Sequence, residues 1–172
     1  MEHIEAAPDS MRVAECTPAA DTQAEACLAI ARALPEYFTA DAVAQLRRDL
    51  AEHAVYVVEE RSDQAEAVTG FAVVARKNGA VAEVLGLAMH PARQGRGHGS
   101  TLLTTVTERL RAHDVALLEV KTLAPDARYA PYDATRRFYE RAGFVHLETV
   151  DPYPGWEPGN PCAIYVKILK IP

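Results

Sequence analysis

The sequence predicts an α+β fold, with a mixed, mostly antiparallel sheet of six or seven strands flanked by about four helices. Three consecutive strand patterns between residues 54 and 89 predict an antiparallel meander, since Asn78-Gly79 is a strong hairpin signal between the last two. Strand, helix and strand patterns between residues 81 and 122 predict a parallel pair with a crossover helix. Apolar residues make up 49% of the 172 residues, enough for the core of a single domain over residues 1–172.

Two amphipathic helices are expected before the meander. In the first, apolar residues recur at 3.6-residue spacing after Asp21, a candidate N-cap, and the pattern stops before Pro35. Either Thr39 or Asp41 can cap the second helix, whose apolar residues also share one face.

The segments around these helices are less regular. Residues 1–10 are expected to be loose, and residues 11–15 to form a first strand. The connector between the helices is short and aromatic, and its Tyr37 and Phe38 either line a pocket or fill the core.

Three strands, a short helix and a long loop complete the chain. The expected elements are a strand over residues 115–122, a helix from Asp133 or Thr135 to a left-handed Gly143, a strand over residues 144–150, a loop over residues 151–161 and a strand over residues 162–169.

Composition excludes several classes of function. A net charge of −6 argues against a nucleic-acid partner, which needs a basic face. No apolar run reaches the roughly 18 residues of a membrane span, and the acidic N-terminus lacks the apolar core of a signal peptide. The 3 cysteines and 6 histidines lack metal-ligand spacing, so no metal is expected. Reduced thiols in a cytoplasmic protein are the favoured reading.

A basic, glycine-rich turn, Gln94-Gly95-Arg96-Gly97-His98-Gly99, links the third meander strand to the crossover helix. Unpaired N–H groups and the macrodipole make a helix start attractive to anions, and glycines let the backbone approach a ligand closely. Arg93, just before the turn, and Arg96 and His98 within it add cationic or hydrogen-bonding side chains. The stretch therefore predicts a phosphate or pyrophosphate site.

Two common phosphate motifs do not fit this turn. A P-loop needs Lys before Ser or Thr, whereas Gly99 is followed directly by Ser100-Thr101. A dinucleotide site needs G-x-G-x-x-G after the first strand of a βαβ unit, whereas this turn reads G-x-G-x-G in mid-chain. A turn that merely caps an ordinary helix would explain one or two glycines, but less easily three beside two arginines.

What fits is Q-x-x-G-x-G, formed by Gln94, Gly97 and Gly99. In its place between strand and helix, this pattern resembles the acetyl-CoA-binding segment of the GNAT superfamily of acyl-CoA-dependent N-acetyltransferases. A second family landmark is similar to residues 138–144, Phe-Tyr-Glu-Arg-Ala-Gly-Phe. One departure is Tyr132, where many members carry an Asn that contacts the CoA arm. The order of elements also matches, so the resemblance covers nearly the whole chain and implies the GNAT fold.

The resemblance implies acetyl-CoA as the acyl donor. The residues it assigns to the donor are Leu87, Ala88, Met89, Gln94, Gly95, Arg96, Gly97, His98, Gly99 and Ser100. In family members the strand before the turn splays or bulges and frees an amide for the thioester carbonyl, so amides near Leu87–Met89 are the candidates here.

Proton transfer needs an acid for the leaving thiolate and a base for the amine. Tyr139 is the candidate acid, because a phenol with a pKa of about 10 keeps its proton at neutral pH. Alternatively, it packs on its helix and hydrogen-bonds CoA. Glu83 is the candidate base, directly or through water; it could instead bind the acceptor's charge or face solvent. His90, Glu119 and water are further candidates for the base.

The expected function is transfer of an acetyl group to a primary amine of a small molecule, by direct attack in a ternary complex. Protein or peptide acetylation, or a non-catalytic acyl-CoA sensor, are the alternatives. The acceptor site is expected from residues 35–41, the strand start near Glu83 and the loop over residues 151–161 with Trp156. An acidic lining of Glu36, Asp41, Asp151 and Glu157 would suit a cationic amine. Many GNAT proteins dimerise, so the resemblance leaves a homodimer open.

Overall fold

The computed structural model describes residues 10–17, 19–61 and 65–170, and in this part of the chain the predicted α+β fold is confirmed. Its strands form one seven-stranded sheet in the order β1-β2-β3-β4-β5-β7-β6, with β4 and β5 parallel. The strands are β1 (Ser10–Glu15), β2 (Ala54–Arg61), β3 (Glu66–Arg76), β4 (Val81–Met89), β5 (Leu117–Leu123), β6 (Val145–Val150) and β7 (Cys162–Ile168). The α-helices are α1 (Asp21–Arg32), α2 (Ala40–Glu52), α3 (His98–Ala112) and α4 (Pro131–Arg141).

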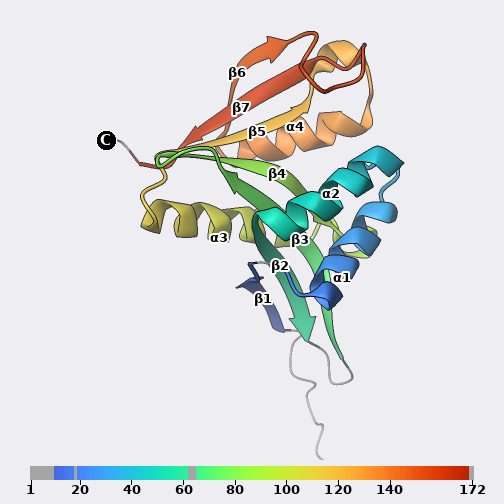
Figure 1. Cartoon of the computed structure of the whole chain (residues 1–172), viewed down its shortest axis with the longest axis vertical. Coiled ribbons are helices and arrows are strands. Elements are labelled where there is room, and N and C mark those ends of the chain that lie inside the picture. The colour runs from blue at the N-terminus through green and yellow to red at the C-terminus, as the bar shows by residue number, and fades with distance from the viewer. Residues whose placement is uncertain (1–9, 18, 62–64, 171–172) are drawn as a thin grey trace, which may run out of the picture.

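Helices cover both faces of the sheet (Figure 1). The core has two parts: α1 and α2 pack on one face, where Phe71 and Val73 of β3 are fully buried. On the other face α3 and α4 pack through residues that include Leu102, Val106 and Tyr139. The unbroken run of buried residues along β3, from Thr69 to Val74, thus reflects apolar neighbours on both faces of the strand. No helix in the described ranges is long and apolar enough to cross a membrane.

The starts of the first two helices have different caps. The prediction of Asp21 as N-cap is wrong, because Ala20 is the N-cap and Asp21 is the first helical residue. There the Asp21 charge lies at the positive end of the helix, and the Gln23 side chain accepts a hydrogen bond from the Ala20 N–H at 3.3 Å. Of the two candidate caps for α2, Thr39 is the N-cap, since its hydroxyl accepts from the Ala42 N–H at 3.2 Å, and Asp41 lies in the first turn.

The helix α4 begins earlier than expected, and its end is as predicted. It starts at Pro131 rather than at Asp133 or Thr135, because proline suits the first helical turn. Gly143 follows the helix with a φ of 86°, the left-handed conformation predicted for it. The Asn78 turn is also confirmed, because the Asn78 side chain accepts hydrogen bonds from the N–H groups of Ala80 and of Val81, the first residue of β4.

Two expected irregular segments fall partly on structured residues. The loose segment does not include Ser10, which begins β1, and residues 1–9 lie outside the described residues. The polar sequence of residues 61–66 predicts a turn between the first two meander strands, but Arg61 belongs to β2 and Glu66 to β3. Residues 62–64 of that turn are also outside the described part.

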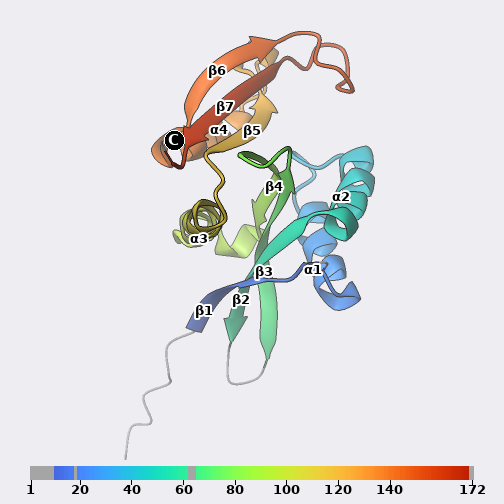
Figure 2. The same cartoon turned by 60° about the vertical axis from the view of Figure 1, so that its left-hand side comes forward.

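The strands β4 and β5 diverge halfway along their length (Figure 2). They pair only as far as Val84, after which β4 continues beside β3 and β5 beside β7. At the same point Val73 lies opposite Gly86 and Val74 opposite Val84, so Leu85 is an extra residue in β4. The last part of β4 therefore has an edge of backbone groups without a strand partner on the β5 side.

Candidate functional site

A groove of about 1220 Å³ occupies the space where β4 and β5 diverge. Its floor is the second half of β4 and β5, one wall is the α1–α2 connector with the start of α2, and the other is the start of α3 with α4. The predicted donor residues that line it are Leu87, Ala88, Met89, Gln94, Gly95, Gly97, His98, Gly99 and Ser100. Tyr139 lines it too, whereas Arg96 and Glu83 are not part of its lining. The structure thus brings most of the predicted site together.

The glycine-rich turn delivers an uncapped helix start into this groove. Gly95 and Gly97 have φ values of 73° and 82°, a conformation that favours glycine. Gly97 is the N-cap of α3 and has no side chain to cap the first N–H groups. The helix begins at His98, so His98 and Gly99 belong to the helix rather than to the preceding turn. An anion is therefore the natural partner of these N–H groups.

The polar side chains of the turn have different surroundings. The Gln94 side-chain amide donates to the Met89 carbonyl at 3.3 Å, which fixes the turn to the end of β4. Arg96 is exposed, and no partner for it occurs among the described residues. Arg93 donates through Nε to Glu60 Oε2 at 2.6 Å, so Arg93 is already paired with a carboxylate.

Glu60 is a site residue that sequence reasoning missed. It lies near the end of β2 and is buried, and it contacts both Arg93 and His98. Nothing in the sequence points to it, because 33 residues separate it from Arg93 and other acidic residues also follow the β2 pattern.

Tyr139 lies on α4 with its ring enclosed by aromatic neighbours. Its ring centroid is 5.2 Å from that of Phe138 and 5.4 Å from that of Phe144, both in edge contacts. Burial raises the pKa of Tyr139 well above the usual range for a phenol. Because its pKa is raised, the hydroxyl keeps its proton at neutral pH. No hydrogen bond of this hydroxyl occurs among the described residues, so it is available to donate to a ligand in the groove.

Glu83 belongs to a cluster of two acids and two lysines at the closed end of the β4–β5 pair. Its carboxylate oxygens lie 2.7 Å from Lys121 Nζ and 3.1 Å from Lys77 Nζ, and Glu119 contacts the same two ammonium groups. Burial lowers the pKa of Lys121, but hydrogen bonds to the two carboxylates outweigh burial and raise it overall. Glu83 is therefore held as an ion pair, and the structure does not place it on the groove.

Three tyrosines connect the two walls at the far end of the groove. The Tyr37 hydroxyl donates to the Pro131 carbonyl at 3.0 Å, and the Tyr129 hydroxyl donates to the Glu36 carbonyl at 3.1 Å. The Tyr37 and Tyr132 ring centroids lie 5.3 Å apart. Tyr132, the residue that departs from the family pattern, thus joins α4 to the α1–α2 connector.

The elements expected to form the acceptor site lie around these tyrosines. Tyr37 and Phe38 both line the groove, and both also pack against the core. The two alternatives for these residues, lining a pocket and filling the core, are therefore both correct. Trp156 and Glu157 line the groove from the loop before β7, whereas Asp151 does not. The acidic residues that reach the lining are Glu36, Asp41, Asp49 and Glu157.

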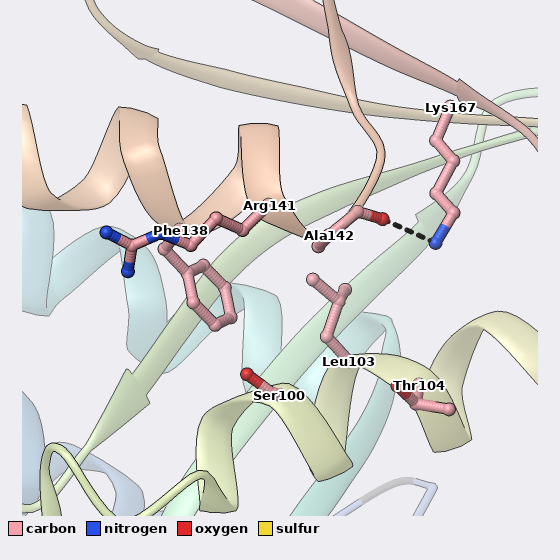
Figure 3. Close-up of a pocket in the computed structure, with 7 residues that line it drawn as sticks. All are labelled: Ser100, Leu103, Thr104, Phe138, Arg141, Ala142 and Lys167. Atoms are coloured by element: carbon pink, nitrogen blue, oxygen red, sulfur yellow. Dashed lines mark hydrogen bonds between the residues drawn. The ribbon is translucent and has the colours of Figure 1, made fainter.

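A smaller pocket of about 340 Å³ lies between α3 and α4 (Figure 3). Ser100 and Phe138 line both this pocket and the groove, so the two spaces adjoin. Lys167 donates to the Ala142 carbonyl at 2.6 Å, while Arg141 extends from α4 in the other direction (Figure 3). No partner for Arg141 occurs in the described part of the chain.

The cysteines and other potential metal ligands are dispersed. Cys27 and Cys162 are buried free thiols, and Cys16 is half-buried. Burial raises the pKa of Cys27 to about 12 and that of Cys162 to about 11, so both are unreactive thiols. Among the described residues no three His, Cys, Asp or Glu side chains are grouped so that they could hold a metal ion.

Comparison with known proteins identifies the family. A family model described as an acetyltransferase (GNAT) domain matches residues 51–146, more than half of the chain. The chain therefore belongs to the GNAT acetyltransferase family. No curated protein sequence matches it.

Solved structures show the same fold. A putative GNAT-family acetyltransferase from Desulfovibrio desulfuricans is similar at a TM-score of 0.77 and 20% identity, over 94% of this chain and 100% of that one. The ribosomal-protein-S18-alanine N-acetyltransferase from Escherichia coli has a TM-score of 0.71 and 17% sequence identity, over 95% of this chain and 96% of that one. An aminoglycoside 6'-N-acetyltransferase complexed with coenzyme A has a TM-score of 0.68 and 14% sequence identity, over 94% of this chain and 98% of that one. The last two proteins are named for very different acceptors, so the likeness establishes the fold without selecting a substrate.

Proposed function

We propose that this chain transfers the acetyl group of acetyl-CoA to a primary amine of a cationic small molecule, by direct attack in a ternary complex. The observation that carries the proposal is the groove itself. It contains an uncapped helix start for an anion, a free strand edge and a buried phenol, and it continues to an acidic, aromatic end.

The donor is assigned to the part of the groove nearest α3. The N–H groups at the start of α3 and the exposed Arg96 side chain would bind the pyrophosphate. Amides of Leu87–Met89 on the free edge of β4 would polarise the thioester carbonyl, because an N–H fixed in a dry site stabilises the developing oxyanion. The adjoining pocket beside Arg141 would receive the nucleotide end of the donor.

Proton transfers follow from the same arrangement. The amine nitrogen attacks the thioester carbon, the carbon–sulfur bond breaks, and Tyr139 gives its proton to the departing thiolate. For the proton that leaves the amine, water in the groove is a better acceptor than direct contact with Glu83, since ammonium groups lie against both Glu83 oxygens. Glu83 would then contribute as a member of the cluster of two acids and two lysines, and it would not itself accept the proton of the amine.

The acceptor is assigned to the end lined by the tyrosines and by Trp156. Exposed carboxylates such as Glu36, Asp41 and Glu157 favour a cationic molecule, and aromatic rings favour an apolar or cationic body. The free thiols agree with a reducing compartment, and we place the protein in the cytoplasm on that ground.

The test is release of CoA thiol from acetyl-CoA in the presence of polyamines, aminoglycosides, amino acids and N-terminal peptides. We expect turnover with a polycationic small molecule. Turnover with peptides alone would move the function to protein acetylation. Tight CoA binding without turnover on any amine would favour the sensor and contradict the assignment of Tyr139 as an acid.

A further inference from the structure

We propose that Glu60 is a positioning residue for the donor's pyrophosphate, acting through Arg93 and His98. The proposal rests on the acyl-CoA function inferred above. Glu60 Oε2 accepts from Arg93 Nε at 2.6 Å, Oε1 lies 3.1 Å from His98 Nδ1, and the Thr69 hydroxyl donates to Oε1 at 3.2 Å. The carboxylate is buried, with the residue 8% exposed.

The Arg93 hydrogen bond fixes the residue before the turn, whereas His98 Nδ1 lies within ion-pair distance of Glu60 without a hydrogen bond to it. Arg93 precedes the turn and His98 is the first residue of α3, so one carboxylate lies against the residues on either side of positions 94–97. Glu60 itself lies on β2, a rigid strand paired on both sides by β1 and β3. The geometry of the anion-binding turn is therefore set by the sheet and not by the turn alone.

The hydrogen bond between Arg93 and Glu60 leaves the two terminal nitrogens of the guanidinium group without a partner among the described residues. Glu60 takes only the Nε–H, and in the described residues no group pairs with the two terminal nitrogens of Arg93, whose side chain lines the groove. A guanidinium presents its terminal N–H groups as a rigid fork that suits phosphate oxygens. A fixed fork binds more tightly than a mobile one, because less side-chain entropy is lost on binding.

An uncompensated negative charge beside an anion site weakens that site. Here the carboxylate faces two cationic or hydrogen-bonding side chains and a hydroxyl, so its charge is compensated locally. Removing it would leave Arg93 and His98 without their buried partner, and the ligand would have to order both side chains. The net effect of Glu60 on donor affinity is therefore favourable.

The test is calorimetric titration of CoA into Glu60→Gln, with steady-state kinetics of acetyl-CoA. Gln keeps the size of the side chain and removes the charge. We expect the Kd of CoA and the KM of acetyl-CoA to rise roughly tenfold, with kcat changed by less than about twofold, the effect of losing about one charge-assisted hydrogen bond.

Glu59→Gln is the matched control. Glu59 is the neighbouring residue on β2, is equally buried at 8% exposed, and pairs with Arg12 at 2.7 Å on the β1 side of the sheet. The Glu59→Gln variant loses an ion pair that does not involve the turn, so its Kd for CoA should equal that of the wild type. Equal weakening in both variants would reduce Glu60 to a general stabilising role and overturn the proposal.

A double-mutant cycle keeps the idea testable if Glu60→Gln folds poorly. Thr69→Val removes one donor to Glu60 and should weaken CoA binding a few-fold, and less so when Arg93→Ala is already present. Full additivity of the two changes would contradict action through Arg93. A wild-type chain that fails to bind CoA overturns the acyl-CoA function and this proposal with it, whereas wild-type affinity in Glu60→Gln overturns this proposal alone.

Discussion

Tyr139 carries the chemistry of the proposal at the scale of single residues. In the proposed mechanism its hydroxyl would donate a proton to the departing thiolate, and its ring packs against Phe138 and Phe144. Packing of the ring holds the hydroxyl in position, so no hydrogen bond to the hydroxyl is needed for that purpose. The proposed acid role therefore depends on the position of the hydroxyl and on the proton that it retains.

Tyr139→Phe should lower kcat by about 10²-fold and leave the KM of acetyl-CoA within a few-fold, because only proton donation is lost. Tyr165→Phe is the control, since Tyr165 is also buried and its hydroxyl donates to Glu140 on the far side of α4. Steady-state kinetics of both variants decide the point. Wild-type turnover in Tyr139→Phe would exclude the residue as the essential acid.

The pH dependence of kcat follows from the direction of the Tyr139 shift. Burial raises the pKa of Tyr139, so the protonated, active form persists as pH rises past the ordinary value of about 10. We expect no loss of kcat from this group between about pH 7 and 10. A wild-type falling limb below pH 9 that disappears in Tyr139→Phe would show that the phenol ionises early and would contradict the account.

Glu83→Gln separates a direct base from a residue of the charge cluster. If water accepts the amine proton, kcat should fall less than about tenfold, and the acidic limb of the pH–kcat profile should remain. The unfolding temperature should fall, because Lys77 and Lys121 lose a shared partner at this end of β4. Disappearance of the acidic limb together with a loss of about 10³-fold would restore Glu83 as the base.

At the scale of elements, much of the fold was predictable because each element carries its own pattern. Alternating apolar residues, the Asn78 turn and Gly143 are local features, and local chemistry decided them. Cap positions were harder, as at Ala20, where the cap comes from a neighbour's side chain reaching back. Glu60 and the Tyr37–Tyr132 contact could not be predicted, since tertiary packing alone joins residues 33 and 95 positions apart.

Gly97→Ala tests the turn and helix start that are proposed to bind the anion. Gly97 has a φ of 82° at the N-cap of α3, so a side chain there costs about 1–2 kcal/mol and tends to rotate the first N–H groups away from the ligand. We expect a lower unfolding temperature and weaker CoA binding. Gly79→Ala is the control, because a Cβ at Gly79 meets nothing within 4 Å and its φ is not in the left-handed range. Equal CoA affinity in the two variants would contradict the role of this turn.

At the scale of the whole molecule, a parallel pair that separates midway creates a site that spans the sheet. In the proposed function the α3 side would receive the charged donor. The helices α1 and α2, which lie on the opposite side of the sheet from α3 (Figure 1), and their connector contribute acids and aromatic rings to the groove lining. The tyrosine contacts join the α1–α2 connector to α4, so the acceptor end is shaped by elements from both ends of the chain. In the proposed function the turn and β4 would set the donor half and the loops would set the acceptor half, which would let a common fold serve different amines.

A crystal structure of the chain with CoA tests the central claim most directly. The account predicts the pyrophosphate on the N–H groups at the start of α3, with the CoA sulfur within about 3.5 Å of the Tyr139 hydroxyl, between β4 and β5. A pyrophosphate bound away from residues 94–100, or a sulfur that lies outside the reach of Tyr139, would contradict it.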